Sequence, residues 1–396
     1  MRVLFTTLPL TGHFNPRVPI ARALRDAGHA VAFACPAGFA PVVEAAGFPA
    51  LPAGFEERGQ PLRELFPGLN RLPHAERPVW VNTRLFIGVY AAAMAANLLG
   101  VCRAWSPDLI VRDAGEFGGC VAAEALGLPH ASVRTAAVAG SYTLRGRLNA
   151  ALAPLRERAG LDPDPDDAML FRYLHLAAEP PGFVPPGEAH APTAHLLRPV
   201  NFESGDEPLP AWVATLPDRP TIYATLGTID SGGPLGRATF AAILDGLRDE
   251  PYNLVLTVGR ENDPAQFGPQ PPHVRIERYI PQTRLLPRCD LVVNQGGFST
   301  VTGALNAGLP LVVVPLGADQ PLNAACCAAL GVARVVEPEE RTPEAIRAAV
   351  RAVLADPAYR ANAERVRDEM AALPGPDHAV ALLEQLAVEK RPILAE

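Results

Sequence analysis

The chain has 396 residues, which at about 150 residues per domain predicts two or three domains and excludes a small protein stapled by disulfides. Hydrophobic residues make up 48% of the sequence and charged residues 19%, and the formal charge of −7 gives no electrostatic reason to expect nucleic acid or a membrane as partner. All of the 35 basic residues except Lys390 are arginine, which excludes a phosphate-binding P-loop, a protein kinase and a pyridoxal phosphate enzyme, since each needs a lysine within its fold.

The first part of the sequence alternates between strand and helix patterns. An apolar strand is expected at residues 3–7, followed by a turn at residues 11–13 and a helix with Asn15 as N-cap and Pro16 at its first position. Further strands are expected at residues 30–34, 109–112 and 131–134, and further helices at residues 86–104 and 117–126. This alternation predicts a parallel sheet with helices on both faces.

The same alternation restarts after a proline-rich stretch at residues 204–220, which is expected to link two domains. Beyond it, strands are expected at residues 221–226, 253–258, 274–279, 291–294, 311–314 and 333–336, with a helix at residues 238–247. We therefore expect an α/β protein of two doubly wound, Rossmann-like parallel-sheet domains that hold a ligand between them. The domains are expected at residues 1–203 and 221–375, with a last helix in residues 376–396 that returns to the first domain.

Targeting and membrane signals are weak in this sequence. The N-terminal apolar stretch is short and leads into a turn, so no signal peptide is expected. Residues 85–102 are weakly polar but are diluted by Asn97, glycines and alanines, which favours a buried or cleft-lining helix over a membrane span. The cysteines are scattered, with neither a CxxC pair nor zinc-site spacing, as is typical of a reducing cytoplasm. They are Cys35, Cys102, Cys120, Cys289, Cys326 and Cys327.

The most informative stretch, residues 290–324, reads DLVVNQGGFSTVTGALNAGLPLVVVPLGADQPLNA. Here a strand runs into QGG, whose glycines permit close backbone approach, and Ser299 and Thr300 stand at the start of the next helix. A helix N-terminus with free N–H groups and two hydroxyls is suited to bind phosphate. Taken singly, the pieces also fit a tight strand-to-helix turn, and Asp319 also fits a helix N-cap.

The order of these pieces, PQ…LLPRCDLVVNQGG…ST…GALNAGLP…VP…DQPLNA, resembles the nucleotide-sugar signature of the family 1 glycosyltransferases. The opening TGHFNP resembles the acceptor-side histidine turn of that family. The resemblance is strongest at residues 221–336, clear at residues 1–30 and weak at about residues 50–200. It implies the GT-B fold, with two domains facing across a cleft, and the activity of bacterial natural-product, macrolide-type glycosyltransferases.

The resemblance also implies roles for residues of the second domain. Tyr279 is expected to stack on the pyrimidine of the donor, Ile280 to offer backbone hydrogen bonds to its edge, and Gln282 to lie near the ribose. Asp319 and Gln320 match the pair that binds the hydroxyls of the donor sugar. The residues expected to meet the diphosphate are Gln295, Gly297, Ser299 and Thr300, with Gly227 and Thr228 of the TLGT turn.

In the first domain, His13 matches the catalytic base of the family, and Asp113 is the best candidate for the carboxylate that orients it. A histidine with an ordinary pKa near 6.5 can take a proton from an acceptor hydroxyl near neutral pH. Attack opposite the diphosphate inverts the anomeric carbon, and the helix N-terminus meets the departing charge, so no metal is required. The resemblance thus implies a UDP- or TDP-sugar as co-substrate, with no cofactor and no metal.

Two residues depart from the family pattern, and one acidic run has the spacing of a metal site in another class of glycosyltransferases. Gln295 stands where family members usually carry a histidine, and Ser299 where they carry a glycine. A neutral amide donates a hydrogen bond but no charge, so we expect a loss of about 1–2 kcal/mol of leaving-group stabilisation, or roughly tenfold in rate. The run DPDPDD at residues 162–167 has the DxD spacing of metal-dependent glycosyltransferases, but the alternating prolines favour a solvated loop that caps the helix near Ala168.

The acceptor pocket is the least explicit part of the sequence. Aromatic side chains in the weakly matching region would suit a flat, apolar acceptor better than a polysaccharide. The candidates are Phe55, Phe66, Trp80, Phe86, Tyr90, Met94 and Tyr142. Two other functions remain open: a nucleotide-sugar-binding auxiliary protein with little turnover, which Gln295 suggests, and a nucleotide-sugar epimerase of the same fold, which leaves the TGHFNP turn without a role.

Overall fold

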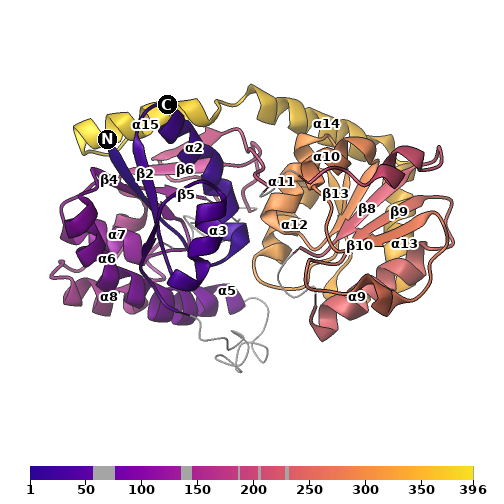
Figure 1. Ribbon diagram of the computed structural model, residues 1–396, viewed down its shortest axis with the longest axis horizontal. Coiled ribbons are helices and arrows are strands. Elements are labelled where there is room, and N and C mark those ends of the chain that lie inside the picture. Colours follow the sequence, from indigo (N-terminus) through magenta and orange to yellow (C-terminus); the bar gives the residue numbers. More distant parts are fainter. Residues whose placement is uncertain (57–75, 135–144, 186–187, 204–206, 228–231, 396) are drawn as a thin grey trace. The chain divides into compact units, whose positions relative to one another are not determined.

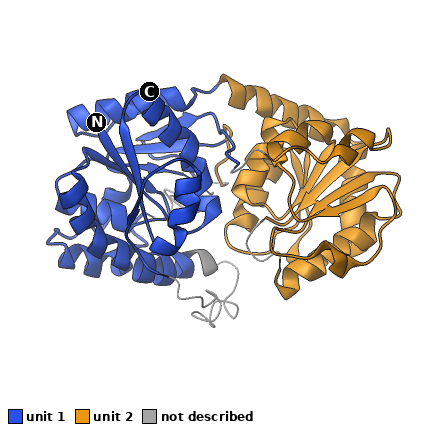
Figure 2. Cartoon of the chain, in the orientation of Figure 1, with its two compact units in different colours: residues 1–179, 187–204, 373–396 blue, residues 180–186, 205–372 orange. Residues whose placement is uncertain are grey.

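The computed structural model describes residues 1–56, 76–134, 145–185, 188–203, 207–227 and 232–395. They form two compact units (Figure 2), the first made of residues 1–179, 187–204 and 373–396 and the second of residues 180–186 and 205–372. The expected boundaries differ from this division at three places. Residues 373–375, expected at the end of the second domain, belong to the first unit. Residues 180–186 belong to the second unit, and so does most of the expected linker, because Val213 is buried there and Trp212 donates a hydrogen bond of 3.1 Å to Glu277.

The first unit is built on a seven-stranded, parallel sheet with the strand order β3-β2-β1-β4-β5-β6-β7 (Figure 1). The strands are β1 (Arg2–Thr6), β2 (Ala30–Cys35), β3 (Ala50–Pro52), β4 (Leu109–Asp113), β5 (His130–Val133), β6 (Leu174–Ala178) and β7 (Ala194–Leu197). Val3 and Phe5 pack with the core on one face of the sheet and Leu4 with the core on the other. The apolar runs that predicted β1, β2, β4 and β5 are therefore strands buried on both faces.

Helices cover both faces of this sheet. They are α1 (Thr11–Phe14), η1 (Asn15–Arg17), α2 (Val18–Asp26), η2 (Ala37–Phe39), α3 (Ala40–Ala45), α5 (Arg77–Trp80), η4 (Val81–Ala91), α6 (Ala92–Trp105), α7 (Gly118–Ala125), α8 (Asn149–Arg158), η6 (Ala168–Phe171) and α15 (Pro376–Glu389). The C-terminal helix α15 lies beside α2, and its Leu383 and Leu386 join the core on that face (Figure 1). The expected turn at residues 11–13 is wrong, because the chain becomes helical at Thr11, after an extended Leu10, and Asn15 is therefore not an N-cap.

One helical stretch of the described residues, Val81–Trp105, is long and apolar enough to cross a membrane by length and composition. In this structure its inward face is part of the first unit, with Leu85, Met94 and Leu98 buried. It packs on α7 through Gly118, where an added Cβ would lie 2.7 Å from the Ala91 carbonyl oxygen. The apolar residues on this inward face therefore fill the core of the first unit.

The second unit repeats the architecture with a six-stranded, parallel sheet of order β10-β9-β8-β11-β12-β13 (Figure 1). Its strands are β8 (Thr221–Thr225), β9 (Asn253–Thr257), β10 (Val274–Glu277), β11 (Leu291–Asn294), β12 (Leu311–Val313) and β13 (Ala333–Val335). Its helices are η7 (Ala211–Thr215), α9 (Pro234–Leu247), η8 (Pro264–Phe267), α10 (Gln282–Leu285), η9 (Leu286–Arg288), α11 (Phe298–Asn306), α12 (Gln320–Ala329), η10 (Pro338–Glu340), α13 (Pro343–Ala355) and α14 (Pro357–Ala372). All six strands agree with the expected ranges to within two residues.

The strand order reverses once in each sheet, between β1 and β4 in the first unit and between β8 and β11 in the second. At such a switch point the connections from the two central strands leave in opposite directions, so the carboxyl ends of the strands border an open crevice. The residues that follow β1, β4, β8 and β11 are therefore the ones that the topology presents to a ligand.

Candidate functional site

In the first unit, the switch point joins His13 to Asp113. His13 lies on α1, directly after β1, and Asp113 is the last residue of β4. The Nδ1 atom of His13 is 2.6 Å from Oδ2 of Asp113, and the His13 side chain is 17% exposed while that of Asp113 is fully buried. An ionised carboxylate only accepts hydrogen bonds, so Nδ1 is the donor, and in the neutral imidazole this tautomer leaves the lone pair on Nε2. This is the arrangement of an oriented general base.

The Asp113 carboxylate is held ionised by its surroundings. Its Oδ1 accepts a hydrogen bond of 2.9 Å from the Gly115 N–H and lies 3.4 Å from Nη1 of the fully buried Arg17. Arg17 in turn donates from Nη2 to the Thr7 hydroxyl at 2.9 Å. Burial alone would oppose ionisation, but Arg17, His13 and Gly115 outweigh it and hold the pKa of Asp113 well below its usual range. The Asp113 carboxylate is therefore ionised at neutral pH.

A second buried carboxylate, Glu116, fixes the start of α7 beside this pair. It accepts hydrogen bonds from the Thr6 hydroxyl at 2.6 Å and from the N–H groups of Gly118 at 2.5 Å and Gly119 at 2.8 Å. Burial raises the pKa of Glu116, against these hydrogen bonds and the nearby Arg112. Glu116 thus ties β1 to α7, and α7 in turn supports the helix η4.

An apolar surface beside His13 comes from η4 and the loop after β3. The ring of Phe86 meets the His13 ring edge-on, with centroids 5.8 Å apart, and Tyr90 lies within 6.4 Å of Phe86. Phe55 packs edge-on against Tyr90 at 5.9 Å, and Leu8 completes the cluster. Three of the acceptor candidates are therefore brought together near His13. Tyr90 is buried, and the half-buried rings of Phe55 and Phe86 are the parts of this cluster that can face an apolar acceptor.

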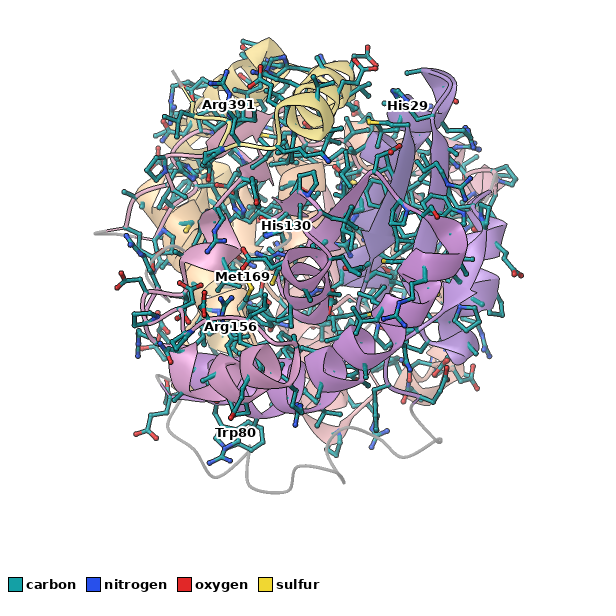
Figure 3. All side chains as sticks on the ribbon, turned by 90° about the vertical axis from the view of Figure 1, so that its left-hand side faces the viewer. His29, Trp80, His130, Arg156, Met169 and Arg391 are labelled. Carbon is teal, nitrogen blue, oxygen red and sulfur yellow. The ribbon has the colours of Figure 1, made fainter. Side chains whose placement is uncertain are left out.

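Of the other acceptor candidates, the described residues Met94 and Trp80 are not part of this cluster. Met94 is 2% exposed and packs with Leu4 and Leu98 in the core, so it is not part of a binding surface. Trp80 lies at the lower margin of the first unit in Figure 3, below Arg156 and Met169. Phe66 and Tyr142 lie outside the described residues.

In the second unit, the switch point brings the loop after β8 against the loop after β11. Gly227 has a φ of +68°, and a Cβ there would collide with the amide nitrogen of Gln295. A Cβ at Gly297 would lie 2.7 Å from the same atom. The Gln295 side chain is therefore inserted between two glycines, one from each loop, and neither glycine can be replaced without displacing it. Thr228, the next residue of the first loop, lies outside the described residues.

The helix α11 starts at this point. Gly297 is its extended N-cap residue and makes no side-chain cap, so the first N–H groups of α11 lack that partner. Thr300 is buried and Ser299 half-buried in the first turn. Gln295 is 6% exposed, and its buried Oε1 has no hydrogen-bond partner among the described residues. The free N–H groups of the helix N-terminus and the NH2 group of Gln295 are donors suited to an anionic group, whereas the Gln295 oxygen is an acceptor and would need a donor.

Asp319 and Gln320 stand at the start of α12 on the same edge of the sheet. Gln320 uses its side-chain oxygen internally, accepting from the N–H groups of Leu316 at 2.8 Å and Gly317 at 3.0 Å. Its amide N–H groups are therefore what Gln320 can offer to a sugar hydroxyl. Asp319 accepts a hydrogen bond of 2.7 Å from Nδ2 of Asn323, a residue that the sequence did not single out.

The expected base and ribose residues are engaged within the second unit. The guanidinium of Arg260 lies 3.7 Å from the ring centroid of Tyr279 and covers one face of the ring, and Glu207 holds Arg260 by two hydrogen bonds of 2.9 Å. One face of the Tyr279 ring is therefore occupied by Arg260 in this structure. Gln282 donates to the hydroxyl of the buried Tyr223 at 3.2 Å, and the Ile280 side chain is buried in the core.

No group of three or more histidine, cysteine or acidic side chains is placed to hold a metal ion within the described part of the chain. In the acidic run, Asp164 accepts hydrogen bonds from the N–H groups of Ala168 and Met169, and Asp167 accepts one from Leu148. These carboxylates cap η6 and α8, so they are committed to local structure.

The sequence is similar to known proteins over almost its whole length. Residues 241–386 match the family described as erythromycin biosynthesis protein CIII-like, C-terminal domain. The L-demethylnoviosyl transferase of Streptomyces niveus is 31% identical over 404 residues, with 99% of each chain covered. The solved structure of the glycosyltransferase SnogD from Streptomyces nogalater matches with a TM-score of 0.78 at 30% identity, over 98% of this chain and 99% of that chain. The glycosyltransferase VinC in complex with DTDP matches with a TM-score of 0.79 at 28% identity, over 98% and 100% of the two chains.

Proposed function

Because this chain belongs to the natural-product glycosyltransferases of family 1, we propose that it transfers a sugar from a TDP-sugar, or from a UDP-sugar, to a hydroxyl group of a small apolar acceptor. TDP is the first choice because the related VinC and SpnG structures were solved with that nucleotide. The observation that carries the proposal is the His13–Asp113 pair at the switch point of the first sheet, with Phe86 against the His13 ring.

In the proposed reaction, Nε2 of His13 takes the proton of the acceptor hydroxyl while the hydroxyl oxygen bonds to the anomeric carbon of the sugar. The bond from that carbon to the diphosphate oxygen breaks on the opposite side, so the configuration inverts and TDP leaves with the electron pair. Asp113 stays ionised and stabilises the imidazolium that forms. General-base catalysis of this kind contributes about 10²–10⁴ in rate.

The second unit supplies the donor site of the proposal. The N-terminus of α11 with Ser299, Thr300 and the Gln295 amide receives the diphosphate, next to Gly227, with Thr228 as a further expected contact. Asp319 and Gln320 bind the hydroxyls of the sugar, while Tyr279 with the Ile280 backbone binds the base and Gln282 lies by the ribose. Fixed dipoles and hydrogen bonds then stabilise the negative charge that develops on the leaving group.

The proposal includes metal independence and a cytoplasmic location. The diphosphate would be held by N–H groups and hydroxyls rather than by a cation, so activity should survive chelation by EDTA. All six cysteines are buried free thiols, as suits a reducing compartment. The alternatives of an auxiliary binding protein and an epimerase are not favoured, because the similar proteins are named as transferases.

The test is a mass-spectrometric screen of TDP- and UDP-sugars against aromatic and polyketide acceptors, with wild-type protein and His13→Ala. We expect acceptor-dependent release of TDP and a glycosylated product of inverted configuration, and a loss of at least 100-fold in His13→Ala. Near wild-type transfer by His13→Ala would contradict the role of the base. Binding of TDP without turnover on any acceptor would favour the auxiliary protein, and conversion of the nucleotide sugar without acceptor would favour the epimerase.

A further inference from the structure

A single side-chain amide links the loop after β11 to the start of α12. The Nδ2 atom of Asn323 donates a hydrogen bond of 2.8 Å to the carbonyl oxygen of Gly296 and another of 2.7 Å to Oδ2 of Asp319. Asn323 is fully buried, on the second turn of α12. An amide nitrogen has two protons, so one group supplies both of these contacts. Gly296 belongs to the loop proposed to hold the diphosphate, and Asp319 is proposed to bind the sugar.

The loop after β11 and the start of α12 are also in close contact at Gly296. Gly296 has a φ of +91°, and a Cβ there would lie 2.9 Å from the carbonyl oxygen of Gln320 and 3.1 Å from the side chain of Val313. Its N–H donates to Oδ1 of Asn294 at 2.6 Å. The loop therefore has little freedom to slide along α12. The Asn323 amide adds to this packing a hydrogen bond that constrains the rotation of the Asp319 side chain.

We propose that Asn323 is a positioning residue that couples the two parts of the donor site, holding the Asp319 carboxylate in register with the loop that carries the diphosphate. This inference rests on the proposed function and adds a residue to it. A nucleotide sugar would contact both the diphosphate loop and the Asp319 carboxylate. Because the distance between these two groups is fixed before the donor binds, binding does not cost the entropy of ordering them. Without the amide, Asp319 would lose the hydrogen bond that ties its Oδ2 to the loop after β11, and the sugar would meet a less ordered carboxylate.

The measurement compares two ligands, TDP and TDP-glucose, by titration calorimetry on the full chain. The ratio of their dissociation constants reports what the sugar adds to binding, which a general loss of stability does not change. The first variant is Asn323→Leu, which keeps the shape of the side chain and removes both donors. Asn323→Ser is the second, because it is smaller and keeps one hydroxyl donor. Asp319→Ala and the double variant Asp319→Ala/Asn323→Leu complete a double-mutant cycle.

The matched control is Asn253→Leu. Asn253 is also a fully buried asparagine of the second unit, and its Nδ2 donates to the carbonyl oxygens of Pro217 and Arg219 and to the Thr221 hydroxyl. It stands at the first residue of β9, on the amino edge of the sheet. Its replacement removes comparable hydrogen bonds far from the strand ends that carry the donor site. We expect it to lower thermal stability as Asn323→Leu does and to leave the affinity ratio within twofold.

We expect Asn323→Leu and Asp319→Ala each to reduce the preference for TDP-glucose over TDP by about fivefold to tenfold, the effect of losing one hydrogen bond of ordinary net strength. Asn323→Ser should give a smaller reduction, and the double variant should show no further loss than Asp319→Ala alone. An unchanged ratio in both Asn323 variants, or losses that multiply in the double variant, would overturn the inference while leaving the proposed function standing. Wild-type protein that binds neither ligand would overturn both.

Discussion

Nδ1 of His13 and Oδ2 of Asp113 are 2.6 Å apart, although a hundred positions separate the two residues in the chain. β1 and β4 are neighbours in the sheet, paired in parallel from Val3 with Leu109 to Thr6 with Arg112. Both strands therefore end at the same edge, and the short helix α1 returns His13 over the end of β4. The two residues meet because β1 and β4 are adjacent in the sheet. In the proposed enzyme, the first unit therefore supplies the general base.

The first prediction concerns the role of Asp113 in transfer. Asp113→Asn retains the shape of the side chain, but its amide can pair with the other tautomer of His13 and offers no charge to the imidazolium. We expect turnover to fall by about 10²–10⁴ with an unchanged affinity for TDP, since the donor site lies in the second unit. Initial rates and TDP titrations measure this. Asp26→Asn, a change on the surface of the same unit, is the control, and equal activity of Asp113→Asn and the control would refute the role.

The second prediction concerns stability as a function of pH. The pKa of Asp113 lies below its usual range in the folded protein, whereas in the unfolded chain the group takes up a proton near pH 4, roughly the value of a free aspartate. Its stabilisation is therefore present above about pH 4 and is lost as the pH falls toward the folded-state pKa. At pH 7, Asp113→Asn should lower the free energy of unfolding by about 3 kcal/mol, because it leaves Arg17 buried without its counter-charge.

Urea titrations of wild type and Asp113→Asn at pH 7, 5, 4 and 3.5 measure that difference. The gap between the two proteins should be constant from pH 7 to about pH 5 and should narrow below about pH 4. A gap of the same size at every pH would show that the carboxylate is not the source of the stability.

The third prediction concerns the acceptor. Phe86→Ala removes the ring that meets His13 edge-on and opens the apolar cluster with Phe55 and Tyr90. We expect the KM for an apolar acceptor to rise by about tenfold, the effect of losing most of one half-buried aromatic side chain, with little change in the KM for the donor. Phe48→Ala, within the aromatic core on the other face of the sheet, should lower stability and leave the acceptor KM unchanged. An equal acceptor KM in Phe86→Ala and Phe48→Ala would show that Phe86 is not part of the acceptor site.

The fourth prediction concerns the diphosphate loop. Gly227→Ala introduces a Cβ that collides with the Gln295 amide at a φ of +68°. Gly268 has the same φ, and a Cβ there meets nothing within 4 Å, so Gly268→Ala carries the backbone strain without the collision. We expect both changes to cost about 1 kcal/mol or more in stability. TDP binding should weaken by tenfold or more in Gly227→Ala alone, and equal TDP affinities in the two variants would contradict the assignment of this loop.

The fifth prediction concerns Gln295. In this structure its amide is buried between two glycines and offers a neutral donor. Gln295→His would place a group that can carry a positive charge beside the leaving diphosphate, and we expect turnover to rise by up to about tenfold. Single-turnover rates measure the effect, with Gln295→Leu as the variant that offers no donor and should be slower than wild type. A histidine variant as slow as Gln295→Leu would show that the site is shaped for the amide alone.

The element order was accessible to sequence reasoning because parallel strands buried on both faces are continuous apolar runs. That signal predicted β1, β2, β4 and β5, and all six strands of the second unit. It did not predict β6 and β7, whose sequences LHLAA and AHLL include His175 and His195. The buried His175 is paired with the Ser132 hydroxyl at 2.6 Å, a contact between strands that composition does not indicate.

The residues of the candidate site also fall into two groups, those that local sequence signals indicate and those that only tertiary contacts reveal. Glycines and hydroxyls at the end of a predicted strand are local signals, and these indicated Ser299 and Thr300, whereas the roles of His13 and Gln295 came from the resemblance to the family. Arg17 gave no such signal, because an arginine in the fourth position after a histidine is ordinarily exposed, and only the packing of η1 under β4 makes it the buried partner of Asp113. Asn323 follows Asp319 by four residues, a helical spacing, but its second contact with Gly296 comes from a different loop.

The sequence by itself determined which chemical groups this protein has and which strand ends carry them, because hydrophobic periodicity and turn residues act over a few positions. Tertiary structure decided which of those groups meet. The pairing of His13 with Asp113, the burial of Arg17, the insertion of Gln295 between Gly227 and Gly297 and the bridge made by Asn323 all join separate segments. Such contacts depend on the order of strands in the sheet and on close packing between helices and loops, and neither is encoded in any single stretch of the chain.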